Sequence, residues 1–201
     1  RTDMALVYSQ VPCVSAGTFT KNVVKAAPVK WDRQVVDSGA KVQAVVVNSG
    51  IANACTGSEG FGYCKDTADA AAKYLNISAD GVLIGSTGVI GKQIPIDKLT
   101  AGIEVLAGKK NDSLENGTEA AKAIMTTDTA EKELAVTIEV GGKTVTIGGM
   151  AKGSGMIHPN MCTMLAFITS DAVITKEALQ KALSEDVDDT YNMISVDGDT
   201  S

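Results

Sequence analysis

The chain is poor in the residues that usually identify a catalytic or metal site. Its 201 residues include one histidine and four cysteines, and aromatic residues make up only 4%. So little histidine excludes a histidine-rich metal site, and few aromatics disfavour stacking on bases or sugars. The spacing of Cys13, Cys55, Cys64 and Cys162 fits no zinc motif. We expect reduced, mostly buried thiols, no metal and no other cofactor.

Basic clusters and long apolar runs are missing as well. The formal net charge is -6, and no block of lysine or arginine has the density of a nucleic-acid-binding segment. No apolar stretch is long enough to span a bilayer, and no signal peptide is recognisable. These absences predict a cytoplasmic protein that binds neither nucleic acid nor membranes.

What is present is the composition of a globular protein. Hydrophobic residues make up 44% and charged residues 21%, and a chain of this length can bury a core without disulfides or metal. The chain begins at Arg1 directly before a strand-like run, and it ends at Ser201 in a turn. We therefore expect a segment of a longer protein.

Two local patterns give the clearest structural predictions. The pair Gly141-Gly142 separates two alternating runs and predicts a β-hairpin over 134–140 and 143–147. The run 42–48 is nearly all apolar and predicts a strand covered on both faces.

Weaker patterns complete the prediction. Thr175 is a suitable N-cap for a helix that extends to about Tyr191, and Gly108 is expected to stop an earlier helix. Together the patterns predict a mixed α/β fold in which helices cover layered sheets. Further strands are expected at 4–9, 81–85 and 164–169, and further helices at 61–75, 95–106 and 114–125.

The segment Gly85–Lys92 has the look of a phosphate-binding loop but departs from it in detail. Its first glycine is one place too early, and Gln93 replaces the Ser or Thr that would bind magnesium. Residues 86–88 have another possible use: a turn after a buried strand can direct backbone N–H groups at a developing oxyanion. The alternative is a plain strand-to-loop turn.

The segment 152–165 carries the most distinctive combination of residues. Glycines and a lysine precede a Pro-Asn turn, and Thr163 follows before an apolar run. If the peptide bond before Thr163 were cut, its own α-amine, with a pKa near 8, would serve as the base for its hydroxyl. The scarcity of histidine favours such a base, although His158 fits either a catalytic base or a turn residue.

Other side chains with reactive groups have two interpretations each. Lys152 is either a solvated charge or a clamp for a substrate carboxylate. Cys55 and Cys162 are possible nucleophiles, but neither has an evident base, so buried thiols are expected. The run 126–129 is expected at a helix C-terminus and loop, where its hydroxyls can bind polar substrate atoms.

Six blocks in order resemble the ornithine acetyltransferase (glutamate N-acetyltransferase) family of arginine biosynthesis. The resemblance covers essentially the whole chain. The blocks are 23–29, 48–57, 86–91, 124–129, 152–165 and 196–201.

The resemblance implies that a precursor cleaves itself between Cys162 and Thr163. Residues 1–162 would form an α-chain segment and 163–201 the start of a β chain, whose C-terminal half is absent here. Family members commonly have Ala where this chain has Cys162, which is a small departure because a compact residue is kept. Further substrate contacts of the family lie in the absent half, so this chain is not expected to hold a complete active site.

The resemblance also implies roles for individual residues. Thr163 would be the nucleophile, Thr87 and Gly88 the oxyanion hole, and Thr126 and Lys152, with Thr163, would contact substrate. The implied reaction transfers an acetyl group from N2-acetyl-L-ornithine to L-glutamate through an acetyl-Thr163 intermediate. Bifunctional members also take the acetyl group from acetyl-CoA.

The implied fold is an αββα-like sandwich similar to that of N-terminal-nucleophile enzymes, and the implied assembly is a heterotetramer of two α and two β chains. Two alternatives stay open. One is a related N-terminal-nucleophile aminopeptidase or amidohydrolase, and the other is an uncut module that binds a small molecule.

Overall fold

Two three-stranded sheets organise the computed structural model, which describes residues 2–158, 160 and 164–199. The first sheet has the order β1-β2-β3, with bounds Met4–Cys13, Val42–Ile51 and Val82–Val89. Strand β1 pairs antiparallel with β2, and β2 pairs parallel with β3. The polar ends of β2 and β3 therefore lie side by side at one end of the sheet, which is where the candidate site forms.

The central strand β2 is buried on both faces. Ala44 and Val46 pack into a core with helices on one side, and Val47 packs into a second core on the other side. All three side chains are at most 1% exposed. Because successive side chains of a strand point to opposite faces, an uninterrupted apolar run can line two cores at once. The prediction of a strand covered on both faces is confirmed.

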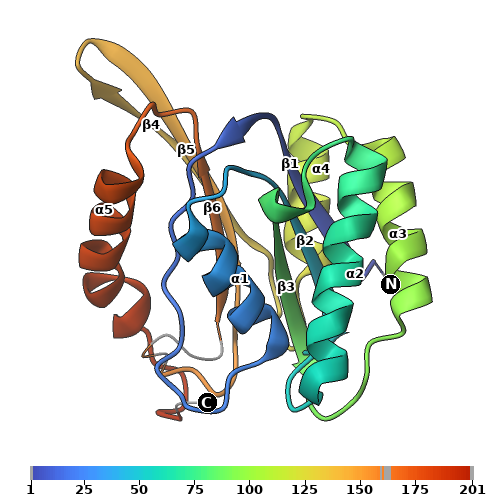
Figure 1. Cartoon of the computed structure of the whole chain (residues 1–201). Helices are drawn as coiled ribbons and strands as arrows, with labels where there is room; N and C mark the ends of the chain where they lie inside the picture. Colours follow the sequence, from blue (N-terminus) through green and yellow to red (C-terminus); the bar gives the residue numbers. More distant parts are fainter. Residues whose placement is uncertain (1, 159, 161–163, 200–201) are drawn as a thin grey trace.

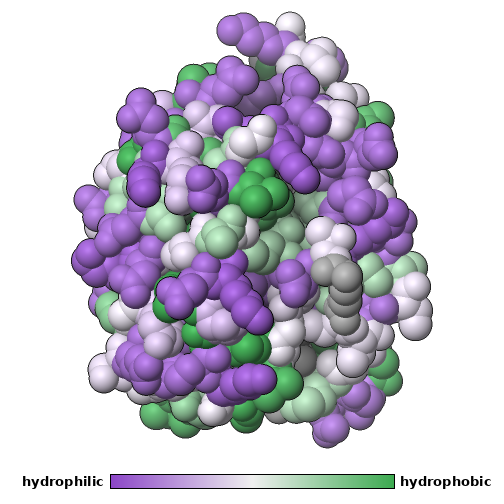
Figure 2. All heavy atoms as spheres, turned by 90° about the vertical axis from the view of Figure 1, so that its right-hand side faces the viewer, coloured by the Kyte–Doolittle hydropathy of each residue, from purple (hydrophilic) through white to green (hydrophobic). Residues whose placement is uncertain are grey.

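Three helices lie against the first sheet: α1 (Ala27–Ser38), α2 (Gly57–Leu75) and α3 (Ile96–Lys109) (Figure 1). A short 3-10 turn, η1 (Ala79–Gly81), leads into β3. The outward surface over α2 and α3 is mostly hydrophilic, with small apolar patches (Figure 2). These helices are therefore amphipathic, with one face in the core and the other in water.

The second sheet is antiparallel and has the order β4 (Lys132–Val140), β5 (Lys143–Lys152) and β6 (Leu165–Ser170). The turn between β4 and β5 has φ values of 59° and 75° at Gly141 and Gly142. Positive φ at both central residues matches the twist of a two-residue hairpin, so that prediction is confirmed.

The two sheets stack through small and large side chains that fit together. Phe167 and Met150 of the second sheet pack against Val47 and Ala5 of the first, where helix α4 (Leu114–Ala123) also contributes. A Cβ atom at Gly85 would lie 2.8 Å from the ring of Phe167. The predicted class, α/β with layered sheets covered by helices, is confirmed.

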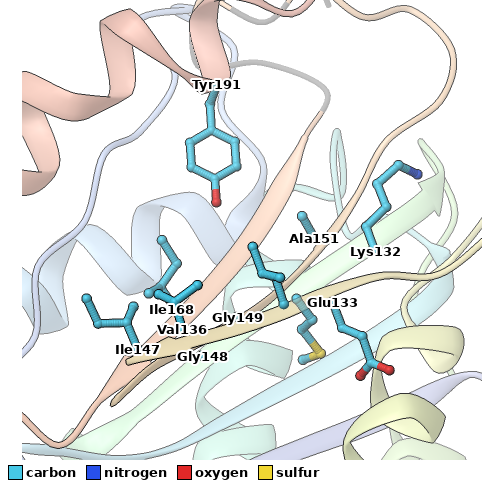
Figure 3. A pocket seen from close by; sticks show the side chains of 11 residues that line it. Lys132, Glu133, Val136, Ile147, Gly148, Gly149, Ala151, Ile168 and Tyr191 are labelled. Atoms are coloured by element: carbon cyan, nitrogen blue, oxygen red, sulfur yellow. The ribbon is translucent and has the colours of Figure 1, made fainter. Parts of the chain in front are cut away.

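The C-terminal helix α5 (Lys176–Asp189) lies on the far side of the β4–β6 sheet from α2 and α3 (Figure 1). Its cap is as predicted, because the Thr175 side chain accepts a hydrogen bond from the backbone N–H of Ala178. The 3-10 turn η2 (Tyr191–Met193) follows, and Tyr191 points toward the strands (Figure 3).

The outer face of the second sheet is apolar and open. Leu134 is 73% exposed, and Val136 and Ile168 are about half exposed. With Tyr191 they line a pocket of about 320 Å³, drawn in Figure 3.

Several sequence-based predictions are wrong in detail. Helix α1 (Ala27–Ser38) has no counterpart among them. Helix α3 continues through Gly108 and ends at Lys109, because Gly108 does not adopt the left-handed conformation of a glycine stop. Cys55 is exposed rather than buried, whereas Cys64 is buried.

Among the described residues, no helix combines the length and apolar character needed to cross a bilayer.

Candidate active site

Two threonine side chains from separate segments meet at one buried lysine. The Lys152 Nζ atom, at the end of β5, lies 3.1 Å from Thr87 Oγ1 and 2.8 Å from Thr126 Oγ1. Thr87 belongs to the last part of β3, and Thr126 lies in the loop after α4. Lys152 itself is only 6% exposed. Positions 65 and 26 residues apart are thus joined by hydrogen bonds.

The environment of Lys152 disfavours the charged form of its side chain. Burial lowers the pKa of its ammonium group, the nearby Asp128 carboxylate opposes this effect, and the positive charge of Lys132 adds to it. An ammonium group has three protons to donate, and the described residues accept two of them, through Thr87 and Thr126. As far as the described residues go, one donor is left for an additional acceptor, such as a carboxylate oxygen of a ligand.

The ends of β2 and β3 are shaped by two glycines. Gly88 has φ +131°, and a Cβ atom there would lie 2.3 Å from the carbonyl carbon of Gly50. Gly50 also has positive φ, +107°, and the pairing register shifts between Gly50 and Ile51. Residues 86–88 therefore lie in the irregular end of a strand, not in the turn after it. The prediction of a turn is wrong, although the backbone remains unusual where an oxyanion hole was expected.

Asn48 ties these two strand ends together. Its side-chain Oδ1 accepts a hydrogen bond from Ser86 Oγ at 2.7 Å, and its Nδ2 donates to the Ile51 carbonyl at 2.9 Å. The residue is 7% exposed. A buried amide whose two ends are both bonded fixes local geometry because breaking either bond leaves a buried polar group unpaired. Asn48 lies within one of the quoted motif blocks, but sequence analysis gave it no role.

The residues predicted for the site have different outcomes. Thr87, Thr126 and Lys152 are brought into one hydrogen-bonded cluster, and Gly88 is next to Thr87 in β3. The predicted nucleophile and cleavage site, Cys162 and Thr163, lie outside the described residues. Their roles, and those of the four other residues, stay predictions.

Asp128 is a second residue whose position sequence analysis did not foresee. Its carboxylate accepts hydrogen bonds from the backbone N–H groups of Thr126 at 3.2 Å and Gly153 at 2.8 Å. Asp128 thus connects the loop that carries Thr126 with the residue that follows Lys152. In the sequence, the only sign of a role for Asp128 was its position within the motif block 124–129.

Within residues 2–158, 160 and 164–199, no group of three or more His, Cys, Asp and Glu side chains is arranged to hold a metal ion.

Two stacked sheets between helices, with a buried lysine that meets two threonine hydroxyls, define a layered α/β protein. The ArgJ family model matches residues 1–201, and the chain belongs to that family.

Curated relatives and solved structures agree with this assignment. The chain is 51% identical to the arginine biosynthesis bifunctional protein ArgJ of Thermotoga neapolitana, over 100% of this chain and 50% of the relative. It is 53% identical to the ArgJ protein of Symbiobacterium thermophilum, over 100% of this chain and 49% of the relative. The chain therefore spans about half the length of these relatives.

Among solved structures, the ArgJ protein of Bacillus halodurans matches with a TM-score of 0.74 and 42% identity, over 81% of this chain and 83% of that chain. An ornithine acetyltransferase from Mycobacterium tuberculosis, solved in complex with ornithine, matches with a TM-score of 0.69 and 43% identity. That match covers 77% of this chain and 81% of the other.

Proposed function

We propose that the complete protein transfers an acetyl group from N2-acetyl-L-ornithine to L-glutamate in arginine biosynthesis. In this proposal it first cleaves itself between Cys162 and Thr163, and Thr163 then carries the acetyl group. Residues 1–162 belong to the α chain and 163–201 begin the β chain. The family resemblance adds to the proposal a cytoplasmic heterotetramer of two α and two β chains, and acetyl-CoA as a further acetyl donor.

The buried cluster of Lys152, Thr87 and Thr126 is the observation that carries the proposal. Both substrates are amino acids with an α-carboxylate, so a single cationic group can hold either of them. Lys152 supplies that cation, and its contacts with the described residues leave one donor for a ligand. The relative that was solved with ornithine bound supports an amino-acid substrate of this kind.

The strand pairing supports a nucleophile at Thr163. Leu165 is the register partner of Lys152 in the β5–β6 pair. Thr163 precedes Leu165 by two positions, and two residues of chain span at most about 7 Å. The register of the β5–β6 pair thus favours Thr163 as the residue that reacts with a substrate held by Lys152.

The lengths of the solved relatives support cleavage. The Bacillus halodurans chain matches over 83% of its length with 81% of this chain, so it is about as long as this chain. The curated relatives are about twice as long. A family whose solved chains have half the length of its encoded proteins fits a precursor that is cut in two.

Cleavage and transfer use the same groups in this proposal. The Thr163 Oγ attacks the Cys162 carbonyl, the acyl group moves from nitrogen to oxygen, and water hydrolyses the resulting ester. The α-amine that is released then takes the proton from Thr163 Oγ as it attacks the acetyl carbonyl of N-acetylornithine. Ornithine leaves with its amine, an acetyl-Thr163 ester remains, and the glutamate amine attacks that ester to give N-acetylglutamate.

In this proposal, hydrogen-bond donors at Thr87 and Gly88 stabilise the negatively charged oxygen of both tetrahedral intermediates. Loss of one such donor typically costs about 2.7–4 kcal/mol of barrier, or a factor of about 10² to 10³ in kcat.

The test is an assay of the complete protein with N-acetylornithine and glutamate, in parallel with amino-acid amides. Production of N-acetylglutamate supports the proposal, whereas hydrolysis of the amides alone supports an aminopeptidase. Intact mass distinguishes two pieces, one starting at Thr163, from an uncut binding module. The Thr163→Ala variant should stay uncut and inactive, and Thr163→Ser should keep part of both activities. A cut before residue 163 in Thr163→Ala would contradict self-processing.

A further inference from the structure

We propose that Asp128 is a positioning residue for Lys152, which it fixes in place and supplies with a counter-charge for substrate carboxylate binding. The inference rests on the proposed function for the identity of that substrate, but the arrangement on which it is built does not depend on the reaction.

The first argument is the way in which Asp128 holds two chain segments. Its side chain is 0% exposed, and it accepts from three donors, of which Gly153 lies on a distant segment. The backbone N–H of Thr126 lies 3.2 Å from Oδ2, and that of Gly153 lies 2.8 Å from Oδ1. Lys132 Nζ lies 2.7 Å from Oδ1. Thr126 accepts a hydrogen bond from Lys152, and Gly153 follows Lys152 in the chain, so one carboxylate fixes both sides of the lysine contact.

The second argument is electrostatic. Among the described residues, the charged groups that act on the Lys152 ammonium are Asp128, in the loop after α4, and Lys132, the first residue of β4. Asp128 raises the pKa of Lys152, while burial and Lys132 lower it. Burial tends to raise the pKa of Asp128 itself, but its bonds from Lys132, Gly153 and Thr126 outweigh this and leave that pKa below its ordinary value. Asp128 is therefore ionised at neutral pH and acts as the fixed counter-charge.

A consequence for binding follows from the sign of these effects. Lys152 attracts a carboxylate only while it is protonated. Above its pKa, the protonated fraction falls about tenfold for each pH unit, and substrate affinity should fall with it. Without Asp128, this loss should begin at a lower pH.

Two variants change the charge near Lys152 in opposite directions. Asp128→Asn removes the counter-charge and should lower the pKa of Lys152. Lys132→Met removes the competing cation and should raise it. Asp171→Asn is the matched control, since Asp171 Oδ1 also accepts a backbone N–H, from Thr146 at 2.7 Å, without acting on Lys152.

The direct readout is an NMR titration of the complete protein labelled with ¹³C at the lysine ε carbons. The Lys152 signal is assigned by its loss in Lys152→Met. We expect its midpoint to move down in Asp128→Asn, up in Lys132→Met, and to stay unchanged in Asp171→Asn. If Asp128→Asn does not fold, the upward shift in Lys132→Met still tests the electrostatic argument. Unchanged midpoints in the variants that fold would overturn the inference.

The kinetic readout separates positioning from general damage. In Asp128→Asn the KM for N-acetylornithine should start to rise at a lower pH than in the wild type, while kcat at low pH changes much less. A fall of kcat alone, with an unchanged pH profile of KM, would contradict the inference. A wild-type protein that is inactive on N-acetylornithine would refute the proposed function, and the NMR titration would still decide the role of Asp128.

Discussion

Substitution of Gly88 by alanine should damage both stability and transfer, for reasons that can be worked out from the structure. The added Cβ would lie 2.3 Å from the Gly50 carbonyl carbon and 2.4 Å from its oxygen. Those atoms are backbone, so they cannot rotate away as a side chain would. In addition, φ at Gly88 is +131°, a value that L side chains rarely adopt.

The two effects add in the free energy of unfolding. Backbone strain at such a φ costs about 1–3 kcal/mol, and overpacking typically costs about 1–3 kcal/mol more. We therefore expect Gly88→Ala to lose about 2–6 kcal/mol. If β2 and β3 separate to relieve the contact, the proposed oxyanion donors move, and kcat should fall by a factor of about 10² to 10³.

Urea denaturation and acetyl-transfer kinetics on the complete protein measure these two effects, and two other glycines serve as controls. Gly91 has φ +72° but open space around its Cβ position, so Gly91→Ala should lose only about 1–2 kcal/mol. Gly62 is exposed in α2 with open space, so Gly62→Ala should gain about 1 kcal/mol. The reasoning is refuted if Gly88→Ala is as stable and as active as Gly91→Ala.

Three further predictions concern other parts of the molecule. Burial raises the pKa of the Cys64 thiol to about 12, so iodoacetamide at pH 8 should alkylate exposed Cys55 well before Cys64, as mass spectrometry of the peptides would show; equal rates would contradict the burial of Cys64. Asn48→Ala should lower stability by about 1–3 kcal/mol because two hydrogen-bond partners lose their bonds, and an unchanged urea midpoint would argue against that role. The pKa of Asp197 is lowered, chiefly by the bond from the Met156 N–H, so its stabilising effect is present above the ordinary carboxyl pKa and is lost as the pH falls through the lowered value. Asp197→Asn should therefore speed amide exchange at Ile157 at neutral pH and make little difference in strong acid, which hydrogen-exchange NMR can check.

Local chemistry explains which elements could be predicted from the sequence. Gly141-Gly142 suits a turn with two positive φ values, and Thr175 caps α5 with its own side chain. Both features depend on only a few neighbouring residues, so the sequence pattern contains all the necessary information.

Helix α1 was missed in the sequence, and the contacts that place it are tertiary. Its Trp31 Nε1 donates to the Val82 carbonyl at 3.0 Å, and the Asp32 carboxylate accepts from the Ile84 N–H at 2.8 Å. Both contacts cover the free edge of β3, some 50 residues further along the chain. The position of α1 against β3 is therefore set by tertiary contacts, although Pro28 in its first turn and Gly39 at its end, with φ +76°, are local signals for a helix.

The residues of the candidate site could also be predicted only in part. The family resemblance singled out Thr87, Thr126 and Lys152, and the structure places them together. Asp128 contributes through Gly153, which is 25 residues away. From the sequence alone, an acidic residue in a hydroxyl-rich loop is expected to be a turn residue, because its contact with Gly153 is not visible there.

The most direct test of the proposed function is to find the acetyl group on Thr163. The complete protein is incubated with N2-([¹³C]acetyl)-L-ornithine without glutamate, quenched in acid and digested for mass spectrometry. We predict one labelled acetyl group on the peptide that begins at Thr163, and its loss as labelled N-acetylglutamate when glutamate is added. An uncut chain without label, or a label on another residue, would contradict the proposed mechanism.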